Sequence, residues 1–599
     1  MDSLVPSRWG RPLESYVAEY GMDGAIVDLL SAANMNDLDH DSEIEKISSV
    51  STNDWQGLNR VTISAIKKLL RLPYAPHTYP KLASPALIHG CIKLMSTIKI
   101  SNRTSPFSYE LGYACFRLVT ACIGACLLHN TGTPAFVERS AELRPAFVTP
   151  VVEGIISHSG GRDRQDYNCV LGWSSCPTHA DHQVQVIVSL SDTRLLMEML
   201  YDDRHLFLKA LRSTHSPGLS AVVFLIWRYV NYQRFLQGPS AANKLIQPLY
   251  DILNRCWLVS TVDQHAAFFY MHQWDKDLWT VWDDTSVIKV TPEDSREIVG
   301  AFTDHITQMS LEPDLSMSLF HLSHALSFLG GRILPSSEDL LGPFISAFIE
   351  RLWFAVAHQE LTNIPLAEAM GTMFSWIKAI LKRLHHTWEI DPIAVMRIID
   401  AVVDADLLLL VGRTIFLVGT ELPTSKDSPG FMANFKVLHG TRELFLDISN
   451  LAPRQLIETR FKSCQPAWWK VYRHFQFMNL VVDPGVITPH GNRWGFYALC
   501  SETWNNIIDS ISAPSDIKGR QMVACHYSRC PDPGILGGAE YSCSWCWRVK
   551  YCSPRCQVMD WVDQNVTRAH RILCARYRSG DATVLRDLQQ FEFTGGAFG

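Results

Sequence analysis

The sequence predicts a mainly α-helical body followed by a small metal-binding module. Apolar residues recur at spacings of three and four from about residue 10 to about residue 512, which is the pattern of amphipathic helices. Alternating, strand-like segments are short and rare, for example 184–190 and 285–290. Seven of the sixteen cysteines lie between Cys525 and Cys574, a stretch that we call the C-terminal module.

Length and composition indicate more than one folded region. The chain has 599 residues, 47% hydrophobic and 19% charged, which is the balance of an ordinary globular protein. We expect helical regions at 1–150 and 191–515, a Gly- and Pro-containing loop or linker at 151–190, and a tail at 579–599. No repeat of about 30 to 50 residues is evident, so the helices allow a solenoid-like body without supporting one.

Apolar spacing places the individual helices. The segment 195–211 is a clear example, because Leu196, Leu200 and Phe207 keep helical spacing. Turn-forming residues collect at 145–182, 420–431 and 483–494, which predicts loops there. The expected helices cover residues 13–32, 56–71, 106–128, 195–211, 218–235, 241–255, 292–310, 340–352, 364–384, 391–410 and 465–481.

Charge is unevenly distributed along the chain. The net charge of -6 is small for this length and argues against a nucleic-acid coat or a polybasic membrane binder. Between Arg520 and Arg578, however, the sequence contains nine basic and four acidic residues, a local net charge of +5. The C-terminal module is therefore basic and the remainder of the chain acidic.

The apolar stretches predict no membrane span. The longest, 113–128 and 402–418, are interrupted by charged residues such as Arg117 and Asp404, which are costly in a bilayer. The first residues contain no apolar run typical of a secretory signal. We expect an intracellular protein of the cytoplasm or nucleus, whose cysteines are core thiols, metal ligands or nucleophiles rather than disulfides.

The C-terminal module holds eight potential ligands in four pairs. Cys543-x2-Cys546 suits a tight turn, whereas Cys552-x3-Cys556 and His570-x3-Cys574 have the spacing of neighbours on one helical face. Eight ligands predict two tetrahedral zinc sites, and ordinary core cysteines would not occur in regular pairs among polar residues. The four pairs are Cys525 and Cys530, Cys543 and Cys546, Cys552 and Cys556, and His570 and Cys574.

The module resembles the MYND zinc fingers, most closely in YCSPRCQVMDW and the later HRILC, over about 50 of the 599 residues. The resemblance implies a cross-brace, whereas spacing alone also permits sequential pairing. Cys525 and Cys530 are further apart than in the family, so neighbouring His526 could compete with Cys530. The implied zinc ligands are Cys525, Cys530, Cys552 and Cys556 for one ion, and Cys543, Cys546, His570 and Cys574 for the other.

The resemblance also implies a binding surface. In MYND fingers a Gln and a Trp line a groove for proline-rich peptides, and the matching positions here are Gln557 and Trp561. Their separation of four residues places both on one helical face. Trp561 could instead pack over the zinc core, and the two roles can coexist. Nucleic-acid binding by the basic module is a further hypothesis, disfavoured because no base-reading helix motif of the CCHH type is present.

The ligand count favours a binding role over a catalytic one. A zinc ion with four protein ligands has no free position for water or substrate. We therefore expect an adaptor or scaffold that binds short linear motifs of partner proteins, with no membrane partner and no small-molecule substrate identified. The alternative is an enzyme whose active site lies in the helical body and is regulated by the module. The sequence has no phosphate-binding loop, nucleophile elbow or His-Glu-x-x-His motif, and no Asn-His-Ser-Cys motif of SET methyltransferases.

Weaker candidates lie in the body. A third metal site could use Cys169, Cys176, His179 and His182, although chance ligands in a disordered loop are the better interpretation. The adjacent Asp202 and Asp203 are interpreted as a solvated helix end or turn rather than a catalytic carboxylate pair. His321 and His324 are interpreted as ordinary helix residues.

Overall fold

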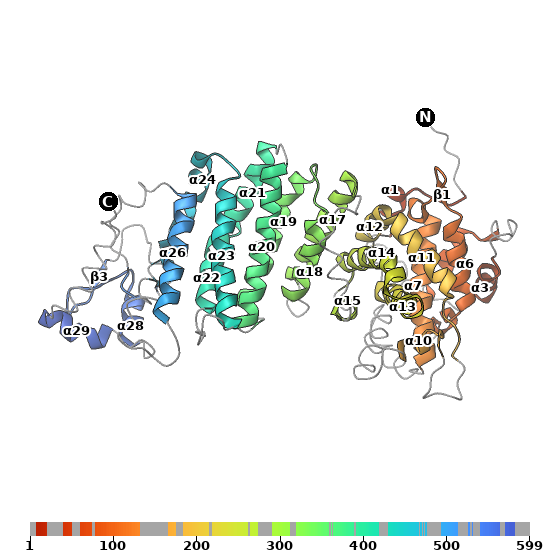
Figure 1. Ribbon diagram of the computed structural model, residues 1–599, viewed down its shortest axis with the longest axis horizontal. Helices are drawn as coiled ribbons and strands as arrows, with labels where there is room; N and C mark the ends of the chain where they lie inside the picture. Colours follow the sequence, from red (N-terminus) through yellow and green to blue (C-terminus); the bar gives the residue numbers. More distant parts are fainter. Residues whose placement is uncertain are drawn as a thin grey trace. The chain divides into compact units, whose positions relative to one another are not determined.

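A computed structural model shows a mainly α-helical chain with two small antiparallel sheets (Figure 1). The predicted fold class is thereby confirmed. The structure describes residues 8–20, 40–50, 60–74, 78–131, 166–174, 184–214, 218–261, 264–273, 290–311, 319–358, 361, 363–387, 391–418, 429–465, 468–469, 471–472, 474–475, 493–512, 525–527, 530, 540–562 and 570–580. Two compact units are present: unit 1 comprises Met1–His305 and Glu312–Met317, and unit 2 comprises Ile306–Leu311 and Ser318–Gly599.

Unit 1 is built from helices around one long apolar helix. Its elements are α1 (Leu13–Tyr16), α3 (His40–Ser48), α5 (Ile63–Leu69), η2 (Leu72–Tyr74), η3 (Tyr79–Leu82), α6 (Pro85–Ser96), β1 (Lys99–Ile100), β2 (Arg103–Thr104), η4 (Pro106–Ser108), α7 (Glu110–Thr131), α10 (Asp166–Val170), α11 (Leu190–Asp202), α12 (Arg204–Arg212), α13 (Leu219–Gln237), α14 (Pro239–Leu258), α15 (His265–Gln273) and most of α17 (Pro292–Leu311). In β1 and β2, Lys99 pairs with Thr104. Helix α7 packs against α5, α6 and α13.

Unit 2 contains a further set of helices and the C-terminal module. Its elements are α18 (Leu319–Gly330), α19 (Glu338–Ala357), α20 (Asn363–Thr387), α21 (Pro392–Asp404), α22 (Leu407–Val418), α23 (Pro429–Ser449), α24 (Arg454–Phe461), η11 (Lys462–Cys464), α26 (Arg493–Ile511), β3 (Tyr541–Ser542), β4 (Lys550–Tyr551), α28 (Pro554–Val562) and α29 (His570–Ser579). Helix α23 packs against both α20 and α26. The solenoid-like arrangement of this body stays a prediction.

Among the residues that the structure describes, two helices are long and apolar enough to cross a membrane by length and composition. They are α7, over Glu110–Asn130, and α19, over Glu338–Ala357. The most apolar window is 100% buried in α7 and 61% buried in α19, as expected for core helices of a folded domain. Arg117 is itself buried within α7, beside the ring of Tyr20. The expectation that no segment spans a membrane stays a prediction.

The predicted helix at 195–211 is in fact two helices, because a buried side chain interrupts it. Asp203 lies between α11 and α12, and its carboxylate accepts hydrogen bonds from the Ser105 hydroxyl at 2.7 Å and the Phe107 backbone N–H at 3.0 Å. A helix end or turn was expected at this position, with both aspartates solvated. The prediction of a solvated Asp203 is wrong, since the side chain is buried against η4.

Other predictions differ from the structure in smaller ways. The expected helix at 56–71 includes α5, which begins at Ile63 and is capped by the Thr62 hydroxyl accepting from the Ala65 N–H, while residues 56–59 lie outside the described residues. Residues 184–190 form no strand. The strand-like piece at 285–290 lies almost entirely outside the described residues, as do most of the predicted linker at 151–190 and the tail at 579–599. Helices on both sides of that linker pack together in unit 1.

Candidate metal centre

Backbone hydrogen bonds within the C-terminal module set the positions of its first two cysteine pairs. The His526 N–H donates to the Lys550 carbonyl at 2.8 Å, which ties the segment of Cys525 to β4. The Cys543 N–H donates to the Val549 carbonyl at 3.0 Å, so the chain reverses between β3 and β4. At this knuckle Trp547 adopts a left-handed backbone with φ of 56°. The turn therefore aims Cys543 and Cys546 inward together.

The third and fourth pairs are positioned by helices. Cys552 follows β4, and Cys556 lies in the first turn of α28, whose N-terminal region is capped by the Ser553 hydroxyl accepting from the Cys556 N–H. His570 and Cys574 are one turn apart on α29. The predicted helical spacing of this last pair is confirmed. The prediction that Cys552 and Cys556 are neighbours on one helical face is wrong, because Cys552 lies before the start of α28.

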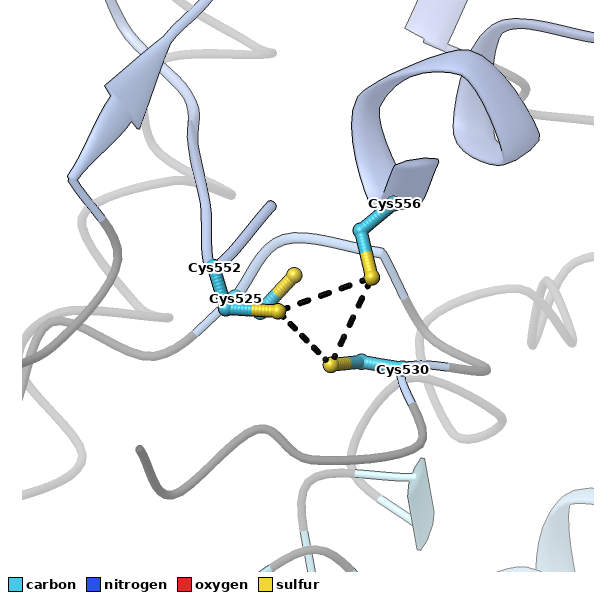
Figure 2. Close-up of side chains that lie close together, drawn as sticks. All are labelled: Cys525, Cys530, Cys552 and Cys556. Atoms are coloured by element: carbon cyan, nitrogen blue, oxygen red, sulfur yellow. Dashed lines mark hydrogen bonds between the residues drawn. The ribbon is translucent and has the colours of Figure 1, made fainter. Parts of the chain in front are cut away.

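The first group consists of Cys525, Cys530, Cys552 and Cys556, whose sulfur atoms all lie within 4.8 Å of one another (Figure 2). The Sγ atom of Cys530 is 3.3 Å from that of Cys552 and 3.7 Å from that of Cys556. A tetrahedral ion with bonds of about 2.3 Å to sulfur separates two thiolates by about 3.8 Å. These two separations are close to that value.

The second group consists of Cys543, Cys546, His570 and Cys574, all of them buried. The Sγ atoms of Cys543 and Cys574 are 3.8 Å apart, and the Cys546 Sγ atom is 3.6 Å from Nε2 of His570. Both distances match two ligands of one tetrahedral ion. The two groups interleave along the chain, which is the pairing that the resemblance implied.

The competition between His526 and Cys530 is resolved by the structure. Cys530 belongs to the first group, whereas a ring nitrogen of His526 lies within 4.8 Å of Asp560 and His570 instead. This third set shares His570 with the second group, so it is not an independent centre. His526 packs beside the ligand cluster, with its ring 6.3 Å from that of Tyr551.

Burial and local hydrogen bonds shift the pKa values of the ligands. A hydrogen bond with Cys530 lowers the pKa of the Cys525 thiol to about 6, against the opposing effect of burial. Burial raises the pKa of Cys552 to about 11 and that of Cys574 to about 12. Burial lowers the pKa of His570 to about 4, so its imidazole is neutral at pH 7 and able to bind a metal. Metal binding would therefore release protons from several thiols.

The module has little apolar core apart from its ligands. Among its described residues, the buried cluster adds Tyr527, Val549, Tyr551 and Tyr577 to the ligand cysteines. The Tyr551 hydroxyl donates to the buried carboxylate of Asp560 at 2.8 Å, and this hydrogen bond links β4 to α28. A core of this size is small for a stable domain, so bound metal would supply much of the folding free energy.

Gln557 and Trp561, the predicted peptide-binding residues, lie one turn apart on α28. Gln557 is half-buried, and Trp561 is 36% exposed. The Trp561 ring centroid is 5.8 Å from that of His570, so its inner face packs on the ligand cluster while its outer part reaches solvent. Packing and surface exposure therefore coexist in this side chain.

Sequence reasoning did not single out Trp545 and Trp547. They flank Cys546 in the knuckle and are 65% and 72% exposed. The Trp545 ring lies 6.3 Å from that of Trp561, at an interplanar angle of 74°. Two tryptophans beside a turn cysteine can be noticed in the sequence as a sign of a binding surface, because large aromatic residues are costly to expose without a partner.

The weaker candidate sites gain no support. Cys169 is buried, with its Sγ atom 3.4 Å from the Ser174 hydroxyl, while Cys176, His179 and His182 lie outside the described residues. The side chains of His321 and His324 are likewise outside the description.

The donor sets of the two groups, four thiols and three thiols with one imidazole, are typical of a soft or borderline divalent metal ion in tetrahedral coordination. Each set fills the coordination shell of one ion. Comparison with known protein families, curated proteins and solved structures finds no match to this chain.

Proposed function

We propose that this chain is a zinc-binding adaptor, whose C-terminal module is a MYND-type finger that binds short proline-containing motifs of partner proteins. The observation that carries the proposal is the juxtaposition of two complete four-ligand groups with a partly exposed Trp561 on α28, the helix that also carries the ligand Cys556. An intracellular location accompanies the proposal, because thiolate ligands persist in a reducing compartment.

Zinc is the metal that best fits both groups. Thiolate and imidazole ligands select zinc over magnesium or calcium, which prefer oxygen ligands. Sulfur separations of 3.3 to 3.8 Å are close to the tetrahedral value of about 3.8 Å. The ions would hold the knuckle of Cys543 and the helices α28 and α29 together, and they would supply no open position for catalysis.

Recognition of peptides is supported by the surface that the ions would hold in place. An extended proline-rich segment loses little conformational entropy on binding and packs well on a tryptophan face. Trp561 offers such a face, and the Gln557 amide, one turn earlier, can donate to or accept from a peptide backbone. This pairing of an apolar platform with a hydrogen-bonding amide is suited to short motifs.

The buried thiols of unit 1 favour the adaptor over a thiol enzyme. Cys115 and Cys122 on α7 are fully buried, and burial holds their pKa values well above that of a free thiol. Such thiols are poor nucleophiles at neutral pH. They serve as small apolar side chains in the core of unit 1.

The proposal is tested by affinity capture with the full-length chain. A variant carrying Gln557→Ala and Trp561→Ala should retain the wild-type metal content and lose partners that are captured through proline-containing segments. Retention of those partners by the variant would refute the assignment of this surface. A variant that loses its metal but still captures the same partners would show that peptide recognition does not depend on the metal sites. That result would contradict the proposal as well.

A further inference from the structure

Trp545 and Trp561 form a right-angled aromatic corner on the surface of the C-terminal module. Their ring centroids are 6.3 Å apart with an interplanar angle of 74°, so the edge of one ring meets the other. Both side chains reach solvent, with exposed fractions of 65% and 36%. A prolyl ring inserted into such a corner contacts two aromatic surfaces at once, whereas a single tryptophan offers one.

The position of Trp545 depends on the metal-binding groups. It lies between Cys543 and Cys546 in the knuckle, and the Trp547 N–H closes that turn by donating to the Cys543 carbonyl at 2.9 Å. Trp561 is held from the other side by its contact with His570. Ligands of the second group thus position both walls of the corner, which pre-organises it for binding.

Exposed cations belong to the same surface elements. Arg548 follows the knuckle, Lys550 lies on β4, and Arg555 lies in the first turn of α28; all three are exposed. None of the three forms an ion pair with a residue that the structure describes. The nearest carboxylate on α28, that of Asp560, is buried and accepts from Tyr551. The charge presented by these elements is positive, and a complementary ligand carries negative charge.

We propose that Trp545 is the second wall of the peptide site, and that the preferred ligand is a proline-containing peptide with acidic residues beside its prolines. The inference rests on the proposed function, since it concerns the same surface. A proline would occupy the corner of Trp545 and Trp561, while flanking Asp or Glu would pair with Arg548 and Arg555. A peptide is favoured over a lipid surface because the half-buried Gln557 provides a directional hydrogen-bonding group beside the corner.

The test uses the full-length chain and a displayed peptide library in which two prolines are fixed and the flanking positions are random. We expect selected peptides to be enriched in Asp and Glu, with an affinity that falls as salt concentration rises. Trp545→Ala should weaken a selected peptide by about tenfold or more, as for a buried aromatic anchor. Trp547→Ala is the matched control: it removes an equally large exposed tryptophan with no ring contact to Trp561 among the described residues, and it should change affinity by less than about twofold.

A charge-reversal variant, Arg548→Glu with Arg555→Glu, should shift the selected flanks from acidic to basic residues. Metal content is measured for every variant, so that loss of the fold is distinguished from loss of the site. The inference is overturned if wild type selects neutral or basic flanks, or if Trp545→Ala binds as tightly as Trp547→Ala. If wild type enriches no peptide, the proposed function fails with it. If the wild-type chain then binds phosphatidylserine vesicles, and Trp545→Ala abolishes this binding, the surface is assigned to a lipid.

Discussion

The Sγ atoms of Cys530 and Cys552 lie 3.3 Å apart, although 22 positions separate them in the chain. Two thiolate ligands of one tetrahedral ion lie at a comparable separation, about 3.8 Å. The same pair joins the segment before the knuckle to the segment that follows β4. A metal ion held by this group would account for both the approach of the sulfurs and the small apolar core around them.

The identity of the ligands leads to a paired prediction. Cys530→Ala should leave one zinc ion per chain, because it removes a ligand of the first group and none of the second. His526→Ala, which alters the residue after Cys525, should retain two ions. Metal analysis of the purified variants checks this. Loss of an ion from His526→Ala, with two ions kept in Cys530→Ala, would reverse the assignment.

Removal of metal should unfold the C-terminal module and spare the helical body. A strong chelator would expose the backbone amides of β3, β4 and α28, since four apolar side chains are a small core without the ions. Helix α7 should keep its slow hydrogen exchange, because its apolar window is buried by unit 1. Hydrogen exchange followed by mass spectrometry distinguishes the two regions, and retained protection of α28 after complete demetallation would contradict the prediction.

Stability of unit 1 should decrease as pH rises through the range in which Asp203 titrates. Burial raises the pKa of Asp203 to about 6, despite opposing hydrogen bonds from Ser105 and Phe107. In the unfolded chain this carboxyl titrates near pH 4. The stability that the protonated Asp203 side chain contributes is therefore fully present below about pH 4 and is lost as pH rises through about 6. The loss is on the order of 2 to 3 kcal/mol. It should be absent in Asp203→Asn and present in Asp202→Asn, as measured by urea unfolding at pH 4 and pH 7; equal profiles for the two variants would refute it.

The ion pairs of Glu110 should stabilise unit 1 at neutral pH. Its buried carboxylate accepts from Arg11 Nε at 2.8 Å and lies 2.7 Å from Lys67 Nζ. Hydrogen bonds from these cations lower the pKa of Glu110 to about 2, although burial acts in the opposite direction. Glu110→Gln should therefore cost about 3 kcal/mol at pH 7, because two cations lose a buried partner.

The exposed Glu19 provides the control for this pair, since it contacts the same two cations at the surface. Glu19→Gln should cost less than about 1 kcal/mol, as surface ion pairs do. Chemical denaturation at pH 7 compares the two variants. A Glu19→Gln effect as large as that of Glu110→Gln would show that burial is not the deciding factor.

The ligand groups were predictable to the extent that spacing and resemblance agree. The pair His570 and Cys574 was predictable from its helical spacing, but only the resemblance implied that it joins Cys543 rather than Cys525. The burial of Asp203 was not predictable, because its partners Ser105 and Phe107 lie about a hundred residues earlier. Local periodicity contains no information about such long-range hydrogen bonds.

The Trp545 contact illustrates the same limit at the candidate site. Its neighbour Trp561 is 16 positions away, beyond an intervening strand, so the corner arises only when the knuckle and α28 are folded together. The sequence did not single out Trp545, and only the three-dimensional arrangement places it beside Trp561 on one surface.

Zinc K-edge X-ray absorption of the full-length chain, combined with metal analysis of the same sample, tests the central claim most directly. Two groups with seven thiolates and one imidazole predict two zinc ions per chain and an average of three to four sulfur neighbours per zinc at about 2.3 Å. Fewer than two ions, or an average shell with fewer than three sulfurs and added oxygen from water, would contradict two closed structural sites.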